Sequence, residues 1–224
     1  MTASQVLVTG FEPYGTTPTN PAQLTAEALD GETIDGVPVT GLIAPSRWFR
    51  CIDVVAAAIA ETSPSHVVML GEYPGRSMIT AERIAQNLND SARYGIADND
   101  GVILEDDETV PGGPVGIYAT LPIRAMVLAM RRAGVPADIS DTGGTLMCNH
   151  LMYGVLQHIA SEALGIKAGW VHLPQLPEVA AVDENLGHPS MSLDTSVRGL
   201  RAAIGAALVH PVDVDEHVHS LLQI

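Results

Sequence analysis

The stretch QVLVTGFEPYGTTPTNPAQLTAEALDG, residues 5–31, predicts the first strand and the first helix of the chain. Its opening QVLVTGF is a short β-rich run that stops at Gly10. A helix is expected after it, because Asn20 suits the N-cap, Pro21 suits the first helical position and Gly31 stands just past the end. A strand that turns into a capped helix is typical of a layered α/β fold.

The rest of the chain repeats this alternation of strand and helix. Strands are expected at residues 37–43, 66–70, 79–87, 137–140 and 169–174. Helical spacing covers residues 48–61, 121–134 and 193–208, with Ser192 as the cap of the last helix. Residues 71–122 are richer in turns, and we expect a protruding hairpin or lid there. Since no repeat or linker interrupts the pattern, residues 1–224 are expected to form one domain.

The composition narrows the class of partner. The 224 residues carry a formal net charge of −15. Nucleic acid and anionic membranes would have to approach against that field, so a small molecule or a peptide is the expected partner. The sequence shows no secretory signal pattern and no apolar run of membrane-spanning length, so a cytoplasmic location is expected. Cys51 and Cys148 are too few for a disulfide framework and are expected to be free thiols.

Cys148 follows a glycine-rich turn in SDTGGTLMCNHLMYGVLQH, residues 140–158. Leu151 and Val155 continue a helical pattern, so the thiol is expected in a first helical turn, where free N–H groups and the helix dipole favour an anion. Such a position lowers the pKa of a thiol toward neutrality. The turn at residues 143–144 also brings backbone donors close to a reacting oxyanion. The alternative is a small buried hydrophobe, which is what we expect of Cys51.

A thiol nucleophile needs a base, and His172 in AGWVHLPQLPE is the best-placed histidine. It ends a predicted strand, where α/β folds usually place their chemistry. Glu82 or Asp90, both in ITAERIAQNLND, can supply the third group that orients the imidazole. A histidine near a strand end is also often a structural residue, so spacing by itself leaves both interpretations open.

Four segments together resemble the pyroglutamyl peptidase I family, the pyrrolidone-carboxylate cysteine peptidases. VLVTGFEPYG at residues 6–15 is similar to the family's N-terminal signature, and GRSMITAERIAQN at 75–87 to the segment that carries its glutamate. GTLMCNHLMYG at 144–154 is similar to the segment of its nucleophile, and GWVHLPQLPE at 169–178 to that of its histidine. All four occur in the family's order and reach from residue 6 to residue 178.

The resemblance implies a single-domain three-layer α/β/α sandwich with a mixed, mostly parallel central sheet, often assembled as a homodimer or homotetramer. It implies a cysteine exopeptidase that removes N-terminal pyroglutamyl groups from peptides, with no metal and no organic cofactor. In those roles Cys148 attacks the pyroglutamyl carbonyl to form a thioester acyl-enzyme. His172 takes the thiol proton and returns it to the leaving amine, while Glu82 orients His172.

The resemblance also implies residues that bind the substrate. Phe11 and Tyr14 line the pocket for the lactam ring, whose flat apolar faces suit aromatic side chains. The alternative is that both rings simply pack a turn onto the core. Arg93, in SARYGIADNDG, is similar to the family's arginine shortly after the glutamate strand, which helps near the oxyanion.

The stretch LGEYPGR, residues 70–76, departs from the small, glycine-rich stretch of the family. A carboxylate at Glu72 can accept the lactam N–H, but its desolvation is costly unless a cation or several donors accompany it. We therefore expect Glu72 either to point to solvent or to mark a shifted substrate with a positive or donor-rich group. The alternative function is accordingly a relative with a pocket for a different N-terminal amide, or a homologue that binds a ligand without turnover.

Overall fold

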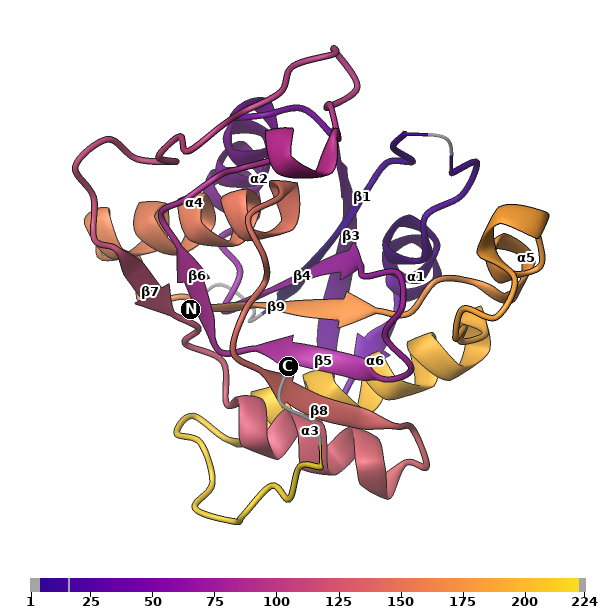
Figure 1. Ribbon diagram of the computed structural model, residues 1–224. Coiled ribbons are helices and arrows are strands. Elements are labelled where there is room, and N and C mark those ends of the chain that lie inside the picture. The colour runs from indigo at the N-terminus through magenta and orange to yellow at the C-terminus, as the bar shows by residue number, and fades with distance from the viewer. Residues whose placement is uncertain (1–4, 16, 222–224) are drawn as a thin grey trace.

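The computed structural model describes residues 5–15 and 17–221, and a seven-stranded sheet forms its centre (Figure 1). The strands are β1 (Val6–Phe11), β2 (Thr33–Ile34), β3 (Val37–Ala44), β4 (His66–Glu72), β5 (Ile79–Glu82), β8 (Ala137–Ser140) and β9 (Lys167–Leu173). Their order is β2-β3-β1-β4-β9-β5-β8. Neighbours run parallel except β2 against β3 and β5 against β9. The predicted mixed, mostly parallel sheet is confirmed.

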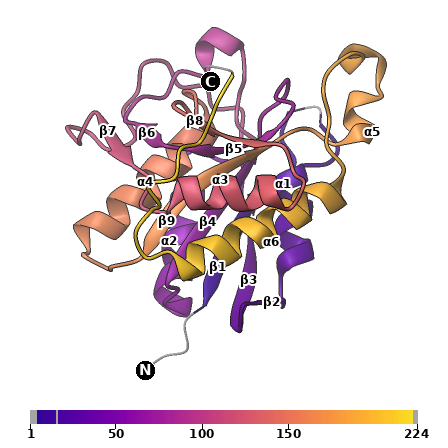
Figure 2. The same cartoon turned by 90° about the horizontal axis from the view of Figure 1, so that it is seen from below.

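Helices cover both faces of this sheet. One face carries α1 (Pro21–Leu29), α3 (Ile123–Arg132) and α6 (Leu193–Val209), which lie together in Figure 2. The other face carries α2 (Arg50–Thr62) and α4 (Met147–Ser161). Side chains alternate along β1, so that Val8 joins the core under α1 and Leu7 the core under α2. The predicted three-layer α/β/α sandwich is confirmed.

The first strand and helix form as their sequence predicts. The Asn20 side chain accepts a hydrogen bond from the Ala22 N–H at 2.9 Å, and Pro21 opens α1. A Cβ on Gly10 would lie 2.2 Å from the carbonyl oxygen of Ala22, so glycine at this position lets α1 pack close to β1. Across the described residues, no helix is both long and apolar enough to cross a membrane.

The single strand predicted over residues 79–87 is wrong. The chain leaves the main sheet after Glu82 and continues as β6 (Ile84–Gln86), which pairs antiparallel with β7 (Gly116–Tyr118). The break lies at Arg83, whose N–H donates to the Ser140 carbonyl while its own carbonyl accepts from Ala119. Residues 87–115 separate the two strands, so they do not form the expected hairpin, and closure of the region as a lid stays a prediction. A short helix, α5 (Pro177–Ala180), was not expected.

Candidate active site

Glu82 and His172 meet because β5 and β9 pair antiparallel. Thr80 stands directly opposite His172 in the register, which places Glu82 on the diagonal position of the same face, within reach of a long side chain. Oε1 of Glu82 lies 2.7 Å from Nδ1 of His172, and both side chains are buried. Of the two predicted orienting groups, Glu82 therefore holds the imidazole. Asp90 instead accepts a hydrogen bond from the Arg93 N–H and contacts Thr145 through its backbone.

The protonation states of this pair follow from their surroundings. Burial lowers the pKa of His172 and outweighs the hydrogen bond and charge of Glu82, which act the other way. Burial alone would raise the pKa of Glu82, but the hydrogen bond from His172 and the nearby charges hold it below its usual range. An ionised Glu82 accepts the proton on Nδ1, so the neutral ring keeps Nε2 as its basic nitrogen.

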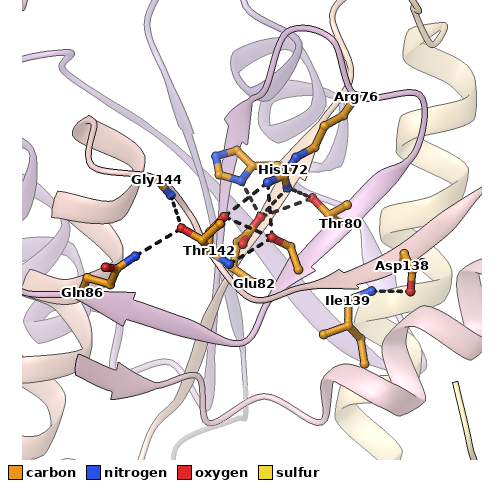
Figure 3. Close-up of polar contacts among 10 residues, drawn as sticks. Arg76, Thr80, Glu82, Gln86, Asp138, Ile139, Thr142, Gly144 and His172 are labelled. Carbon is orange, nitrogen blue, oxygen red and sulfur yellow. Dashed lines mark hydrogen bonds and ion pairs between the residues drawn. The ribbon is translucent and has the colours of Figure 1, made fainter. Parts of the chain in front are cut away.

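Arg76 is a member of this cluster that the sequence patterns did not single out. Its Nη1 lies 2.6 Å from Oε1 of Glu82, the same oxygen that binds His172 (Figure 3). Nη2 donates to the Ser140 hydroxyl and to the Thr142 carbonyl, each at 3.3 Å. A cation in direct contact stabilises the carboxylate of a buried Glu82.

Gly71 brings the thiol of Cys148 to the same place. Gly71 pairs with His172 across β4 and β9. A Cβ on Gly71 would stand 2.9 Å from Sγ of Cys148, so the thiol lies directly over this glycine. Cys148 is half-buried and lines a cavity together with His172. The two residues predicted as nucleophile and base therefore share one cavity.

The predicted lowering of the thiol pKa is wrong for this structure. Burial, with the charges of Glu82 and Glu72, raises the pKa of Cys148 well above its ordinary value. The backbone N–H of Cys148 acts in the opposite direction but is the weakest influence. The start of α4 is where the sequence predicts it, and no side chain caps it. Burial and two carboxylates thus outweigh the helix terminus and favour the neutral thiol.

The turn before α4 has the expected form. Gly144 has a φ of +80°, a conformation that glycine adopts without strain. Its N–H donates to the Thr142 hydroxyl at 3.1 Å. Residues 143–147 line the cavity beside Cys148, so the uncapped end of α4 opens onto it. Backbone N–H groups at such an end are suited to hold an oxyanion.

The cavity has a volume of about 270 Å³, and five aromatic rings contribute to its lining. Its rings come from the end of β1 and the turn after it, from the loop before α2, and from the segments after β4 and after β6. These rings belong to Phe11, Tyr14, Trp48, Tyr73 and Tyr94. Phe11 is buried and its ring centroid lies 5.8 Å from that of Trp170, so this ring both packs on the core and faces the cavity.

Glu72 lines the cavity and does not point to solvent, so that part of the expectation is wrong. Its side chain lies on the inner strand β4, whose two faces are covered, and is only 6% exposed. The Tyr14 hydroxyl donates to Oε2 at 3.3 Å, whereas Oε1 has no hydrogen-bond partner among the described residues. Burial raises the pKa of Glu72 to about 7, against the hydrogen bond from Tyr14. Glu72 therefore exists partly as a neutral acid near pH 7.

Arg93 lies outside the cavity lining. Its side chain is exposed and its guanidinium carbon lies 5.0 Å from the ring centroid of Tyr94, which does line the cavity. In the turn of residues 92–94, Tyr94 contributes to the cavity lining although it is half-exposed, and Arg93 does not contribute. The structure thus brings together Cys148, His172, Glu82, Phe11, Tyr14 and Glu72, and it leaves Arg93 at the rim. Among the described residues, no group of three or more His, Cys, Asp or Glu side chains is arranged to hold a metal ion.

Comparison with known proteins identifies the family. Residues 4–210 match the sequence model of the family described as pyroglutamyl peptidase. The chain is 60% identical over 221 residues to the pyrrolidone-carboxylate peptidase of Mycobacterium tuberculosis, covering 99% of this chain and 100% of that one. It is 41% identical over 212 residues to that of Cupriavidus necator, covering 94% and 96% of the two chains.

Solved structures agree with the sequence comparison. The crystal structure of pyroglutamyl peptidase I from Bacillus amyloliquefaciens superposes with a TM-score of 0.90 at 32% identity, over 96% of this chain and 99% of that one. A pyrrolidone carboxyl peptidase mutant from Pyrococcus furiosus gives a TM-score of 0.86 at 35% identity, over 91% and 98%. The chain therefore belongs to the pyroglutamyl peptidase family and is a hydrolase of that kind.

Proposed function

We propose that this protein removes N-terminal pyroglutamyl groups from peptides, with Cys148 as nucleophile, His172 as base and Glu82 as the group that orients His172. The observation that carries this proposal is the hydrogen bond between buried Glu82 and His172, which lines the same cavity as the Cys148 thiol. A relative that only bound a ligand would have no physical need of all three groups in one place.

In the first step the Cys148 proton moves to Nε2 of His172 as the sulfur attacks the pyroglutamyl carbonyl carbon. A raised thiol pKa suits this order of events, because the proton leaves only when the neighbouring base accepts it. The imidazolium that forms is stabilised by the Glu82 carboxylate. The carbonyl oxygen gains the negative charge, and the N–H groups at the start of α4 are suited to bind it.

In the second step the imidazolium returns its proton to the peptide nitrogen, the C–N bond breaks and the shortened peptide leaves. A thioester between Cys148 and the pyroglutamyl group remains. Water then adds to the thioester carbonyl while His172 takes one of its protons. Breakdown of that adduct releases pyroglutamate, and His172 returns the proton to the Cys148 sulfur.

The lining of the cavity supports a lactam as the group that is bound. Phe11 and Tyr14 offer ring faces to a flat, largely apolar ring. The unpartnered Oε1 of Glu72 is a polar atom that needs a partner, and the lactam supplies both an N–H and a carbonyl. A neutral Glu72 avoids most of the desolvation cost that a carboxylate would bring.

A second substrate class is favoured by the same carboxyl group. An ionised Glu72 would attract a positive N-terminal group, such as the free amine of a prolyl peptide, in place of the neutral lactam. We also propose that the protein assembles as a homodimer or homotetramer. We further propose a cytoplasmic location, where both thiols stay reduced.

The experiment compares hydrolysis of a pyroglutamyl-coumarin amide and a free-amine prolyl-coumarin amide by the protein and by its Cys148→Ser variant. We expect turnover of the pyroglutamyl amide that disappears in the variant. Turnover of only the prolyl amide would overturn the lactam as substrate and support the second class. Turnover that survives in Cys148→Ser would overturn the proposed nucleophile.

A further inference from the structure

Arg76 lies in the segment between β4 and β5, and its side chain is only 9% exposed. A guanidinium cannot neutralise itself by losing a proton, so its burial has to be offset by partners with good geometry. Its Nη1 is 2.6 Å from Oε1 of Glu82, and it also donates to the Thr80 hydroxyl. These partners lie on the strand that carries Glu82, and the cation contacts the same carboxylate oxygen as His172.

The other end of the guanidinium reaches the segment that leads into the Cys148 helix. Nη2 donates to the Ser140 hydroxyl and to the Thr142 carbonyl. The Thr142 hydroxyl in turn accepts from the Gly144 N–H and from the Gln86 side chain, as Figure 3 shows. One planar group therefore connects the carboxylate that orients the base with the turn that precedes the nucleophile.

Tyr73 completes the surroundings of this cation. The guanidinium carbon of Arg76 lies 3.9 Å from the centroid of the Tyr73 ring, a cation–π contact. The same ring meets the imidazole of His172 edge to face, with centroids 5.2 Å apart. The imidazole is thus bounded by Glu82 and Tyr73, and Arg76 contacts both of these residues.

We propose that Arg76 is a positioning residue for the hydrolytic reaction: it fixes the Glu82 carboxylate against His172 and ties this pair to the turn before Cys148. The inference rests on the proposed function, because it assigns a role only if His172 acts as the base. Arg76 acts through Glu82 and does not line the cavity itself.

The charges around His172 give the sign of the expected effect. The titratable and charged groups that contact His172 or Glu82, or line the cavity with His172, come from β4 and β5, from the segments after β4 and β6, from the turn after β1 and from α4. These groups are Glu82, Glu72, Tyr73, Arg76, Tyr14, Tyr94, Asp98 and Cys148. Arg76 is the cation of this set, and its charge lowers the pKa of both Glu82 and His172. Its removal should therefore raise both values.

The test uses Arg76→Gln, Arg76→Lys and the control Arg83→Gln, whose parent side chain is half-exposed and pairs with Asp141 at 3.0 Å. The readouts are kcat/KM for the pyroglutamyl-coumarin amide across pH and the NMR titration of the His172 imidazole, assigned from its loss in His172→Asn. We expect Arg76→Gln to lower kcat/KM about tenfold or more and to move its acidic limb to higher pH. Arg76→Lys should recover part of the rate and restore the limb.

Several results would overturn the inference. One is a folded Arg76→Gln protein with the parent's kcat/KM and the parent's His172 titration. Another is a loss of kcat/KM in Arg83→Gln as large as that in Arg76→Gln. Arg76→Gln is also combined with Glu82→Gln. If Arg76 acts through Glu82, Arg76→Gln lowers kcat/KM far less in the Glu82→Gln background than in the parent. An equally large loss of kcat/KM there counts against the inference. If Arg76→Gln does not fold, Arg76→Lys decides: full parental kcat/KM would exclude the need for a planar fork. If the parent has no turnover, the proposed function fails, and an unchanged His172 titration would separately refute the effect of Arg76.

Discussion

Nδ1 of His172 lies 2.7 Å from Oε1 of Glu82 in a part of the sheet that excludes water from both side chains. The contact fixes which ring nitrogen carries the proton, because an ionised carboxylate only accepts. It also fixes the rotation of the ring, since β9 holds the backbone of His172 against β4 and β5. The remaining nitrogen, Nε2, is the one that can accept a proton.

Glu82→Gln should lower kcat by about two to four orders of magnitude, because an amide cannot stabilise the imidazolium and favours the wrong tautomer. KM should change much less, since Glu82 is not part of the cavity lining. The measurement is steady-state hydrolysis of the pyroglutamyl-coumarin amide at pH 7. Glu61→Gln, at an exposed position near the end of α2, is the matched control. A Glu82→Gln rate within about twofold of the parent would contradict the assigned role.

Alkylation should distinguish the two thiols, Cys51 and Cys148, by their reactivity. Cys51 is fully buried and burial raises its pKa to about 12, whereas Cys148 is half-buried and lines the cavity. Iodoacetamide should therefore modify one thiol per native chain, at Cys148, with loss of all activity. The rate should rise as pH increases, because the pKa of Cys148 is raised and only the thiolate reacts.

Peptide mapping of the labelled protein provides the check, with the Cys148→Ser variant as the control that should stay unlabelled until it is unfolded. Rapid labelling at pH 6 that does not increase with pH would show that the thiol is already ionised. That result would restore the lowered pKa that the helix terminus predicts from sequence.

The sequence was sufficient to select Cys148, His172 and Glu82, which the structure places close together, because each stands in a segment of recognisable pattern. It was also sufficient for most strands, because their apolar runs are local signals. It was not sufficient for the break at Arg83. Residues 79–87 alternate like one strand, and only the hydrogen bonds of Arg83 to Ser140 and Ala119, which are distant in sequence, divide it. Pairings of this kind depend on how the sheet assembles.

Charges posed the same difficulty. Arg76 lies in a turn with no periodic pattern. Its proposed role depends on contacts with Glu82 and Thr142, which come from two other segments. The pKa of Cys148 was predicted from one local feature, the helix start, whereas burial and two carboxylates decide it. Glu72 is a similar case. The sequence shows a carboxylate where the family has a small, glycine-rich stretch, but its burial depends on β4 being an inner strand of the sheet.

Glu72→Gln should change the pH dependence of stability. The folded chain binds the Glu72 proton more tightly than the unfolded chain, with a pKa of about 7 against an ordinary value of 4.5. The parent's free energy of unfolding should therefore fall relative to the variant as pH rises from 4.5 to about 7, by about 3 kcal/mol in total, and stay level above that. Urea unfolding of both proteins at pH 4.5 and pH 8 measures this difference.

The same variant tests the thiol. The charge of Glu72 raises the pKa of Cys148, so its removal should lower that pKa and speed alkylation of Cys148 at pH 8. Glu61→Gln should leave both the stability difference and the alkylation rate as in the parent. If Glu72→Gln unfolds with the parent's pH dependence, Glu72 is already ionised or solvated in the folded protein, and its neutral form has no part in substrate binding.

Gly71→Ala should damage both the fold and the reaction. The added Cβ would lie 2.5 Å from Cζ2 of Trp170 and 2.9 Å from Sγ of Cys148. Trp170 is buried and cannot move freely, so the strand or the thiol has to shift. We expect a loss of about 1–3 kcal/mol in the free energy of unfolding, together with a fall in kcat from a displaced sulfur.

Gly143→Ala is the stability control for this change, because a Cβ there would meet nothing closer than 3.8 Å. Urea unfolding should separate the two variants, and alkylation of Cys148 in Gly71→Ala should report whether the sulfur has moved. A Gly71→Ala protein with the parent's stability and kcat would mean that the thiol does not rest over Gly71. In that case the contact between Gly71 and Cys148 would not explain why Cys148 and His172 lie in the same cavity.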